Sequence, residues 1–350
     1  GYMTGDIKGA WLSDTDTTNV VGTEIVVDGG FESDVASWTI QSSATVTRTT
    51  GSKLTGSYGA QIVSSGGSNI YASRQITGLT VGKLYTISVD YNNLNHSTTI
   101  RFTTSAHSGG TVYGGGSIAA ATGWKNVSAT FTALSTTVWV STYAQGTIYM
   151  DNISVKLADA DRSVNNNGLQ VNGTITKTAV ATGADLVAYS GFSASNYLEQ
   201  PYNADLDFGT GDFSVSFWAK RPAASGSTTV ILSKSPSGLI TPPYFEFQPA
   251  STMRWVGNNS SSRLISTTVF GTSWMFVVMT RISNVGSLYI NGNLEASATN
   301  NDNYNHSNTD TVRVGLRQDG WLGSADQECA LLRISATAPT AAQILEIYNA

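Results

Sequence analysis

The sequence predicts an all-β chain of two tandem antiparallel β-sandwich (jelly-roll) domains, with one short helix at the C-terminal end. Segments of about five to eight residues alternate apolar and polar side chains, and turns rich in Gly, Asn and Ser separate them. Only 12% of the 350 residues are charged and 35 are glycine, a composition that suits short strands and tight turns. The apolar spacing typical of a helix occurs only near residue 345, which argues against a helical bundle.

Three segments follow one another along the chain. Residues 1–23 are polar and rich in turn residues, so we interpret them as an N-terminal arm or linker. Strand patterns begin at Glu24–Asp28 and continue to the end of a first sandwich, which we place at 24–156. The polar stretch 157–168 ends in Asn-Gly and marks the joint, so the second sandwich is predicted over 157–350.

The second sandwich contains the strongest local signal in the chain. Two short apolar runs around Leu288 and Leu294 are joined by Asn291-Gly292, and both turn residues of such a hairpin must tolerate positive φ. Near the C-terminal end, Thr340-Ala-Ala-Gln343 follows Pro339 in the pattern of a capping box. We therefore expect a hairpin turn at residues 291–292 and a short helix after Thr340, which packs against the sandwich.

Charge, hydropathy and cysteine content limit the partners. The net charge of −5 is spread without a basic stripe, so we expect no nucleic-acid partner. No run approaches the roughly 18 apolar residues of a membrane span, so we expect no membrane insertion. Cys329 is the single cysteine and precedes an apolar strand, which predicts a buried thiol and excludes a disulfide within the chain.

Four motifs of the first sandwich occur in an order found in one family. They are Asp28-Gly-Gly-Phe-Glu32 with Trp38, Gly82 to Val89, Trp124 with Thr130-Phe131, and Tyr149 to Val155. In this order they resemble the calcium-containing jelly-roll carbohydrate-binding modules that accompany bacterial xylanases and cellulases. The resemblance implies that Trp38 and Trp124 are packing residues.

Glu32 and Asp151 are the predicted metal ligands. The opening and closing strands of a jelly roll lie side by side, which would bring Glu32 near Asp151. Two carboxylates and loop carbonyls supply the oxygen ligands that Ca²⁺ prefers, and the resembled modules hold a structural calcium at this place. The alternative, that both side chains accept hydrogen bonds from strand-end amides, stays open at this point.

Three aromatic residues are candidates for sugar binding, because pyranose faces stack on rings and hydroxyls need polar edges. Trp139 lies between Val138 and Val140, and Tyr143 shares its face of the strand. If the valines face inward, Trp139 and Tyr143 face outward, but the opposite orientation is also compatible with the sequence. Tyr91, at the end of another predicted strand, is the third candidate.

A second set of motifs lies in the second sandwich: Leu169 to Lys177, Leu186 to Ser193, Tyr202 to Phe213 and Ala330 to Pro339. Together with the hairpin they resemble laminin-G-like (concanavalin-A-type lectin/glucanase) domains, with a stronger likeness to those of phage virion appendage proteins. Many bacterial relatives are acidic where this chain has Ala330, so no calcium site is carried over to that position. The resemblance implies a noncatalytic tail-fibre or head-fibre protein that adheres to host-surface glycans.

Such a protein would lie on the virion surface or outside the cell. Its implied partners are cell-surface or extracellular polysaccharide and other virion or filament subunits, in a homo-oligomer for which a trimer is one option. Two alternatives stay open: a secreted bacterial glycan-binding or extracellular-matrix protein, and a purely structural capsid or filament subunit without sugar affinity. The Glu-x-Asp-x-x-Glu strand that glucanases of this fold use is absent, so we predict that the chain is not an enzyme.

Overall fold

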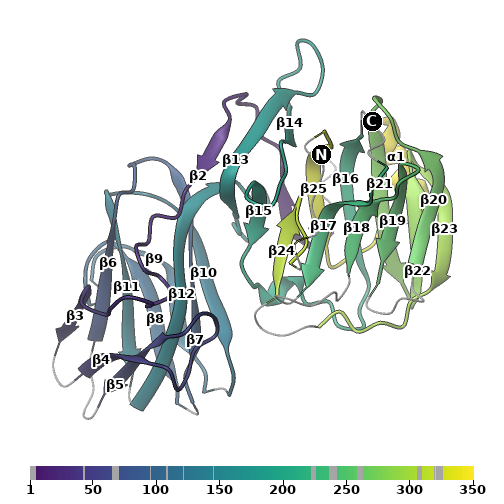
Figure 1. Cartoon of the computed structure of the whole chain (residues 1–350). Helices are drawn as coiled ribbons and strands as arrows, with labels where there is room; N and C mark the ends of the chain where they lie inside the picture. The colour runs from purple at the N-terminus through teal and green to yellow at the C-terminus, as the bar shows by residue number, and fades with distance from the viewer. Residues whose placement is uncertain are drawn as a thin grey trace. The chain divides into compact units, whose positions relative to one another are not determined.

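The computed structural model describes residues 5–41, 44–64, 71–94, 96–107, 109–120, 122–144, 146–221, 226–235, 243–257, 263–305, 310–318, 320 and 326–350. These residues form antiparallel β-sheets and one α-helix near the C-terminal end, which confirms the predicted all-β fold class. The chain divides into two compact units (Figure 1). We call Thr23–Ala158 the first sandwich, and Gly1–Gly22 together with Asp159–Ala350 the second sandwich.

The first sandwich contains two five-stranded antiparallel sheets. The β11 sheet has the strand order β3-β6-β11-β8-β9, and the β12 sheet has the order β4-β5-β12-β7-β10. Between them lies a core of aliphatic and aromatic side chains, among them Phe31, Phe102 and Val140. The strands are β3 (Trp38–Gln41), β4 (Ala44–Thr49), β5 (Gly59–Ser64), β6 (Tyr71–Thr77), β7 (Leu84–Asn92), β8 (Thr98–Thr103), β9 (Val112–Ile118), β10 (Lys125–Thr132), β11 (Thr137–Ala144) and β12 (Gly146–Asp159).

The second sandwich also has two main layers. In the β16 sheet the order is β23-β22-β21-β16-β25, and β25 pairs on its other side with β1 and β14. In the β17 sheet the order is β13-β15-β24-β17-β18-β19-β20. The strands are β1 (Ile7–Trp11), β2 (Val20–Gly22), β13 (Leu169–Ala179), β14 (Val187–Ser190), β15 (Tyr197–Gln200), β16 (Phe213–Lys220), β17 (Thr229–Ser235), β18 (Tyr244–Phe247), β19 (Thr252–Val256), β20 (Arg263–Val269), β21 (Met275–Ile282), β22 (Val285–Ile290), β23 (Asn293–Thr299), β24 (Thr311–Val314) and β25 (Glu328–Ser335). A single 3₁₀ turn, η1 (Ala204–Leu206), precedes β16 in the described residues.

The N-terminal segment is not an arm. β1 pairs with β25 and β2 pairs with β13, so both are strands of the second sandwich. Trp11 and Leu12 are fully buried in its core, where the Trp11 indole N–H donates to the Asn167 carbonyl at 2.7 Å. The interpretation of 1–23 as an arm or linker is therefore wrong for the described part of that segment, because two large apolar side chains and the edge of β25 hold it in place.

A second correction concerns residues 24–28, where the sequence predicts a strand and the structure has none. Side chains satisfy the backbone here. The Glu24 carboxylate accepts the N–H groups of Val26 and Val155, and the Arg74 guanidinium donates to two backbone carbonyls of the segment. Because these hydrogen bonds satisfy backbone groups of residues 24–28, the apolar run does not need to pair with another strand.

The two local predictions for the second sandwich are confirmed. Asn291 and Gly292 have φ of 51° and 81° and form the turn between β22 and β23. The helix α1 (Ala341–Asn349) begins with the capping box of Thr340 and Gln343, and its Ile344 is fully buried against side chains of β21. Cys329 is buried as well, and burial raises the pKa of its thiol to about 12.

One half-buried carboxyl group, that of Asp159, links the N-terminal segment to the rest of the second sandwich. Asp159 accepts the Leu12 N–H at 3.0 Å and the hydroxyl hydrogen of Tyr189. Burial raises its pKa from 3.8 to about 6, although the two hydrogen bonds favour the charged form. The folded protein therefore holds a proton on Asp159 at pH values where the unfolded chain has released it.

The proton on Asp159 makes the unfolding free energy depend on pH, and Asp159→Asn should remove this dependence. The stabilisation that the raised pKa gives is fully present below about pH 4 and is lost as the pH rises through 6. Relative to Asp159→Asn, the native chain should therefore lose about 2.5 kcal/mol of unfolding free energy between pH 4 and pH 7.5. Urea unfolding of both proteins at the two pH values measures this difference, and an equal gap at both would contradict the assignment.

Candidate functional site

Trp139 and Tyr143 lie on the outer face of the β11 sheet. In β11, Val138 and Val140 are fully buried between the sheets, whereas Trp139 and Tyr143 are half-buried. Because neighbouring side chains of a strand point to opposite faces, both aromatic rings face away from the core. The structure thus has the first of the two orientations left open by the sequence. The rings are four residues apart, which is about 13 Å along a strand.

Polar residues dominate the neighbouring strands on this face. The residues in register with Trp139, Ser141 and Tyr143 are Gln75 and Thr103, Ser73 and Arg101, and Tyr71 and Thr99. Gln75, Thr99 and Arg101 are at least partly exposed, whereas Thr103 and Ser73 are fully buried. The exposed three place hydrogen-bonding groups beside the rings, which is the combination that sugar recognition requires. Gln75 and Arg101 were not identified from the sequence, because a polar residue in a strand gives no sign of which cross-strand neighbour it meets.

A short loop divides the face into two areas. The His107 N–H donates to Ser73 Oγ at 3.0 Å, and Ser73 Oγ lies 3.0 Å from Ser141 Oγ. Both serines are fully buried although they lie on the outer side of the sheet. The loop at His107 therefore covers the middle of the face, with Trp139 on one side of it and Tyr143 on the other.

A hollow of about 280 Å³ begins at Gln75, the register partner of Trp139. Asp28, Asp34 and Arg74 line it. Burial raises the pKa of Asp28, but three backbone N–H donors outweigh burial and hold it below its ordinary value. Burial also lowers the pKa of Arg74, which the nearby Asp28 and Asp34 oppose. The hollow thus places charged hydrogen-bonding groups near Gln75, and its volume is at about the lower size limit of ligand pockets.

Tyr91, the third predicted sugar ligand, is not on a surface. Its side chain is only 5% exposed and belongs to the core of the first sandwich. Burial raises the pKa of its hydroxyl. The correction follows from the strand's position: β7 lies between β12 and β10, so its inward residues have no route to solvent.

Glu32 and Asp151 come close to one another, as the sequence predicts. Both carboxylates bind the same loop: Asp151 accepts the N–H groups of Leu54 and Thr55, and Glu32 accepts those of Ser57 and Tyr58. Burial raises the pKa of Asp151, its backbone hydrogen bonds oppose this, and the charge of Glu32 raises it further. The pair therefore anchors one loop through four amide donors at distances of 2.9 to 3.1 Å.

This arrangement matches the alternative role, in which the carboxylates satisfy backbone amides. Across the ranges given above, no group of three or more His, Cys, Asp or Glu side chains is placed to hold a metal ion. The amide donors point at carboxylate oxygens that a cation would also need. A calcium ion at Glu32 and Asp151 stays a prediction.

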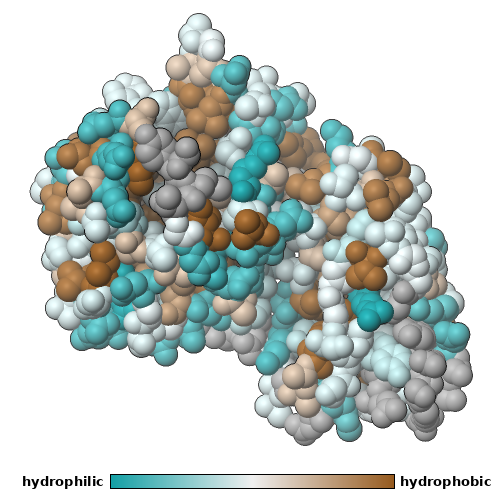
Figure 2. Space-filling view, turned by 180° about the vertical axis from the view of Figure 1, so that it is seen from behind, coloured by the Kyte–Doolittle hydropathy of each residue, from teal (hydrophilic) through white to brown (hydrophobic). Residues whose placement is uncertain are grey.

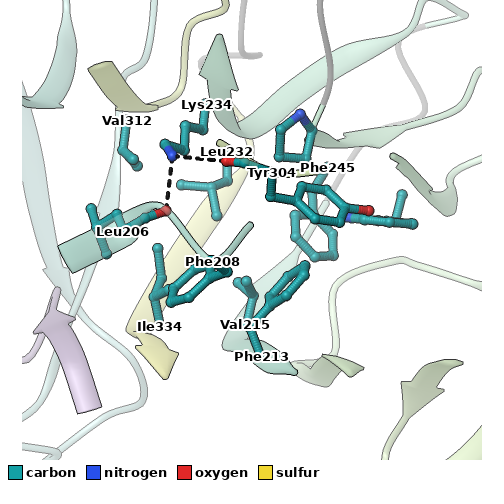
Figure 3. Close-up of a pocket in the computed structure, with 12 residues that line it drawn as sticks. Leu206, Phe208, Phe213, Val215, Leu232, Lys234, Phe245, Tyr304, Val312 and Ile334 are labelled. Carbon is teal, nitrogen blue, oxygen red and sulfur yellow. Dashed lines mark hydrogen bonds between the residues drawn. The ribbon is translucent and has the colours of Figure 1, made fainter. Parts of the chain in front are cut away.

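A small cavity inside the second sandwich is not a binding site (Figure 3). It measures about 40 Å³ and is lined mainly by apolar side chains such as Phe213 and Phe245. At its edge the Lys234 ammonium donates to the Leu206 carbonyl at 2.8 Å and pairs with Asp207. Burial lowers the pKa of Lys234 and the carboxylate opposes that change. Since ligand pockets measure roughly 300 to 1,000 Å³, this cavity is a packing void. The lysine beside it is paired with the Asp207 carboxylate.

Among the described residues, no helix is long and apolar enough to span a membrane. Hydrophobic residues on the face that Figure 2 shows lie in separate groups between hydrophilic and intermediate ones.

The described residues of both units form antiparallel β-sandwiches. A family model, the concanavalin A-like lectin/glucanases superfamily, matches residues 192–345, all within the second sandwich. This match supports the laminin-G-like resemblance of the second sandwich and does not extend to the first. No curated protein sequence matches the chain.

Several solved structures are similar at low identity. They include the receptor-binding domain of botulinum neurotoxin C/D mosaic serotype (19% identity, TM-score 0.45, covering 55% of this chain and 48% of that chain). The binding domain of Paraclostridial Mosquitocidal Protein 1 follows with 16% identity, a TM-score of 0.44 and coverage of 55% and 49%. The ligand-binding domain of botulinum neurotoxin serotype D, in complex with N-acetylneuraminic acid, has 18% identity, a TM-score of 0.45 and coverage of 55% and 48%. This chain spans about half the length of each of these structures.

Proposed function

We propose that the chain is a noncatalytic glycan-binding protein that contacts sugars through the outer face of its β11 sheet. The observation that carries the proposal is the outward orientation of Trp139 and Tyr143 among polar strand neighbours. A saccharide of several rings would stack on Trp139, reach polar groups of the adjoining hollow, and pass the His107 loop toward Tyr143.

The finer proposal is that this binding serves adhesion by a virion appendage of the phage tail-fibre or head-fibre type. Its basis is the motif resemblance of the second sandwich, together with the lectin-type family match. Open sheet faces of this kind bind sugars weakly, and several copies in one assembly raise the overall affinity. We therefore propose a homo-oligomer, with a trimer as one option, on a virion surface or outside the cell. Light scattering that finds only monomers would count against the assembly.

Trp139→Ala should weaken glycan binding by about tenfold or more, because it removes the stacking surface. A glycan array probed with the native chain, with and without Ca²⁺, identifies the ligand, and titration calorimetry then compares the variant. If calcium at Glu32 and Asp151 supports the site, chelation should reduce binding in the same assay.

Tyr149→Ala is the matched control for this prediction. Tyr149 is a half-buried aromatic residue that alternates with buried Ile148 and Met150 in β12, so it lies on the outer face of the opposite sheet. Its loss should leave the affinity unchanged. Absence of binding to every glycan, with and without Ca²⁺, would refute glycan adhesion and favour a purely structural role.

A further inference from the structure

The second sandwich has a larger groove, which is lined by aromatic residues and by two cationic side chains, where the cavity of Figure 3 has one. It measures about 550 Å³ and lies between α1 and the outer face of the β16 sheet. Ser214, Ser216 and Trp218 of β16 line it from the sheet. Ile347 and Tyr348 of α1 line it from the helix. Its size lies within the range of small-ligand sites, roughly 300 to 1,000 Å³.

A β-bulge in β25 shapes one side of this groove. The ladder between β16 and β25 shifts register between Ser216 and Trp218, so that two residues of β25 oppose one of β16. At the bulge Leu331 has a φ of 54° and a 40% exposed side chain that lines the groove. Its N–H donates to the Leu12 carbonyl at 2.8 Å, which holds the strained residue in place. A β-branched or long side chain in this conformation costs energy and is retained where the surroundings hold it.

Three aromatic residues that line the groove pack near one another. Trp218 stacks on Tyr348 with ring centroids 6.0 Å apart, and the ring centroid of Phe276 lies 5.2 Å from that of Trp218. Trp218 also lines a neighbouring hollow of about 200 Å³ together with Trp274 and Leu331. Trp218 and Tyr348 pack against the buried contact of α1 with β21, so a ligand would meet side chains that are already in place.

The charged side chains that line the groove are both arginines. They are Arg162, whose side chain is exposed, and Arg333 of β25, which is half-buried beside the serines of β16. All lining residues fall within the described ranges, and no Asp or Glu side chain is among them. A guanidinium binds a carboxylate through two parallel N–H···O bonds, which gives both charge and orientation.

We propose that this groove binds a sugar that carries a carboxylate, such as a uronic or sialic acid residue. The sugar would contact Trp218 and Tyr348, the carboxylate would meet Arg333 and Arg162, and Ser214 and Ser216 would reach hydroxyl groups. This site is separate in the chain from the outer face of the β11 sheet and does not depend on sugar binding there. It would give the protein a second saccharide specificity, for acidic rather than neutral sugars.

Titration calorimetry on the full chain tests the proposal with three probes: tri-galacturonic acid, 3′-sialyllactose and neutral lactose. At least one acidic probe should bind and lactose should not, and added salt should weaken the binding. Arg333→Gln and Arg162→Gln should each weaken it by tenfold or more. Arg162 is exposed, so its variant keeps the test valid if Arg333→Gln disturbs the fold.

Two controls separate this site from the rest of the molecule. Arg263→Gln changes an exposed arginine of β20 that does not line the groove and should leave binding unchanged. Trp139→Ala, which tests the proposed face of the first sandwich, should also have no effect on the acidic probes. Failure of both acidic sugars to bind at millimolar concentration, equal binding of lactose, or binding that survives both groove substitutions would overturn the proposal.

Discussion

Removal of residues 1–22 is expected to unfold the second sandwich. A fragment cut at the boundary that the sequence suggests, 157–350, lacks β1 and β2 and with them Trp11 and Leu12. The edge of β25 that β1 covers would lose its partner, and the core would lose two fully buried side chains. In hydrogen exchange, the whole chain of residues 1–350 should show protected amides in β16 and β25. The 157–350 fragment should show none.

Trp11→Ala isolates the side-chain part of this effect in the full chain. Loss of a fully buried indole leaves a cavity and an unused Asn167 carbonyl, so the unfolding free energy of the second sandwich should fall by about 3 to 5 kcal/mol. Val21→Thr in β2 is the matched control: Val21 is 52% exposed, and its substitution should cost within about 0.5 kcal/mol. A folded, fully protected 157–350 fragment would refute the claim that the N-terminal segment is structural.

The N-terminal segment shows why the sequence misled at this point. Trp11-Leu12 is a short apolar pair in a mostly polar stretch, and the strand partner of Trp11 lies more than 300 residues later in the chain. Local pattern analysis detects elements through their own alternation or turn residues. A three- to five-residue strand that is stabilised only by a distant edge gives no such pattern, so polarity suggested a linker.

Elements with local signals were predicted well. The turn at Asn291-Gly292 and the capping box of Thr340 and Gln343 depend on residues next to one another in the chain, and the structure has both. The outward orientation of Trp139 follows from alternation, but alternation alone cannot say which face is the core. Tyr91 was misplaced for the same reason: its strand lies between two others, and that position is a property of the whole sheet.

The groove beside α1 could not have been predicted from its residues. Its lining comes from segments around residues 10, 162, 216, 276, 333 and 348, which the fold brings together. The sequence did mark the helix correctly as a packing element, and Ile344 confirms that role. The groove forms because α1 covers only part of the outer face of the β16 sheet, and that incomplete coverage depends on the tertiary fold.

Arg281→Ala should be as damaging as any substitution in the second sandwich, with a loss of about 4 kcal/mol. Arg281 is fully buried at the end of β21, where its Nε donates to the Asn300 carbonyl at 2.9 Å. Its other nitrogens donate to the Gly211 carbonyl at 2.6 Å and to Asn284 Oδ1 at 2.7 Å. One guanidinium thus holds three loops, and its removal leaves three acceptors without their donor.

The geometry predicts an order among substitutions at this position. Arg281→Lys keeps the charge but offers a compact ammonium, which cannot reach three acceptors that the planar fork reaches at once, so it should recover only part of the loss. Arg281→Met keeps the packing over Tyr304, whose ring centre lies 5.8 Å away, but supplies no donor and should be closer to Ala. Arg263→Ala, at an exposed arginine of β20, should cost within about 0.5 kcal/mol. Urea unfolding of the four variants measures the order, and equal stability of Lys and Met would show that packing, rather than the three hydrogen bonds, explains the burial of this arginine.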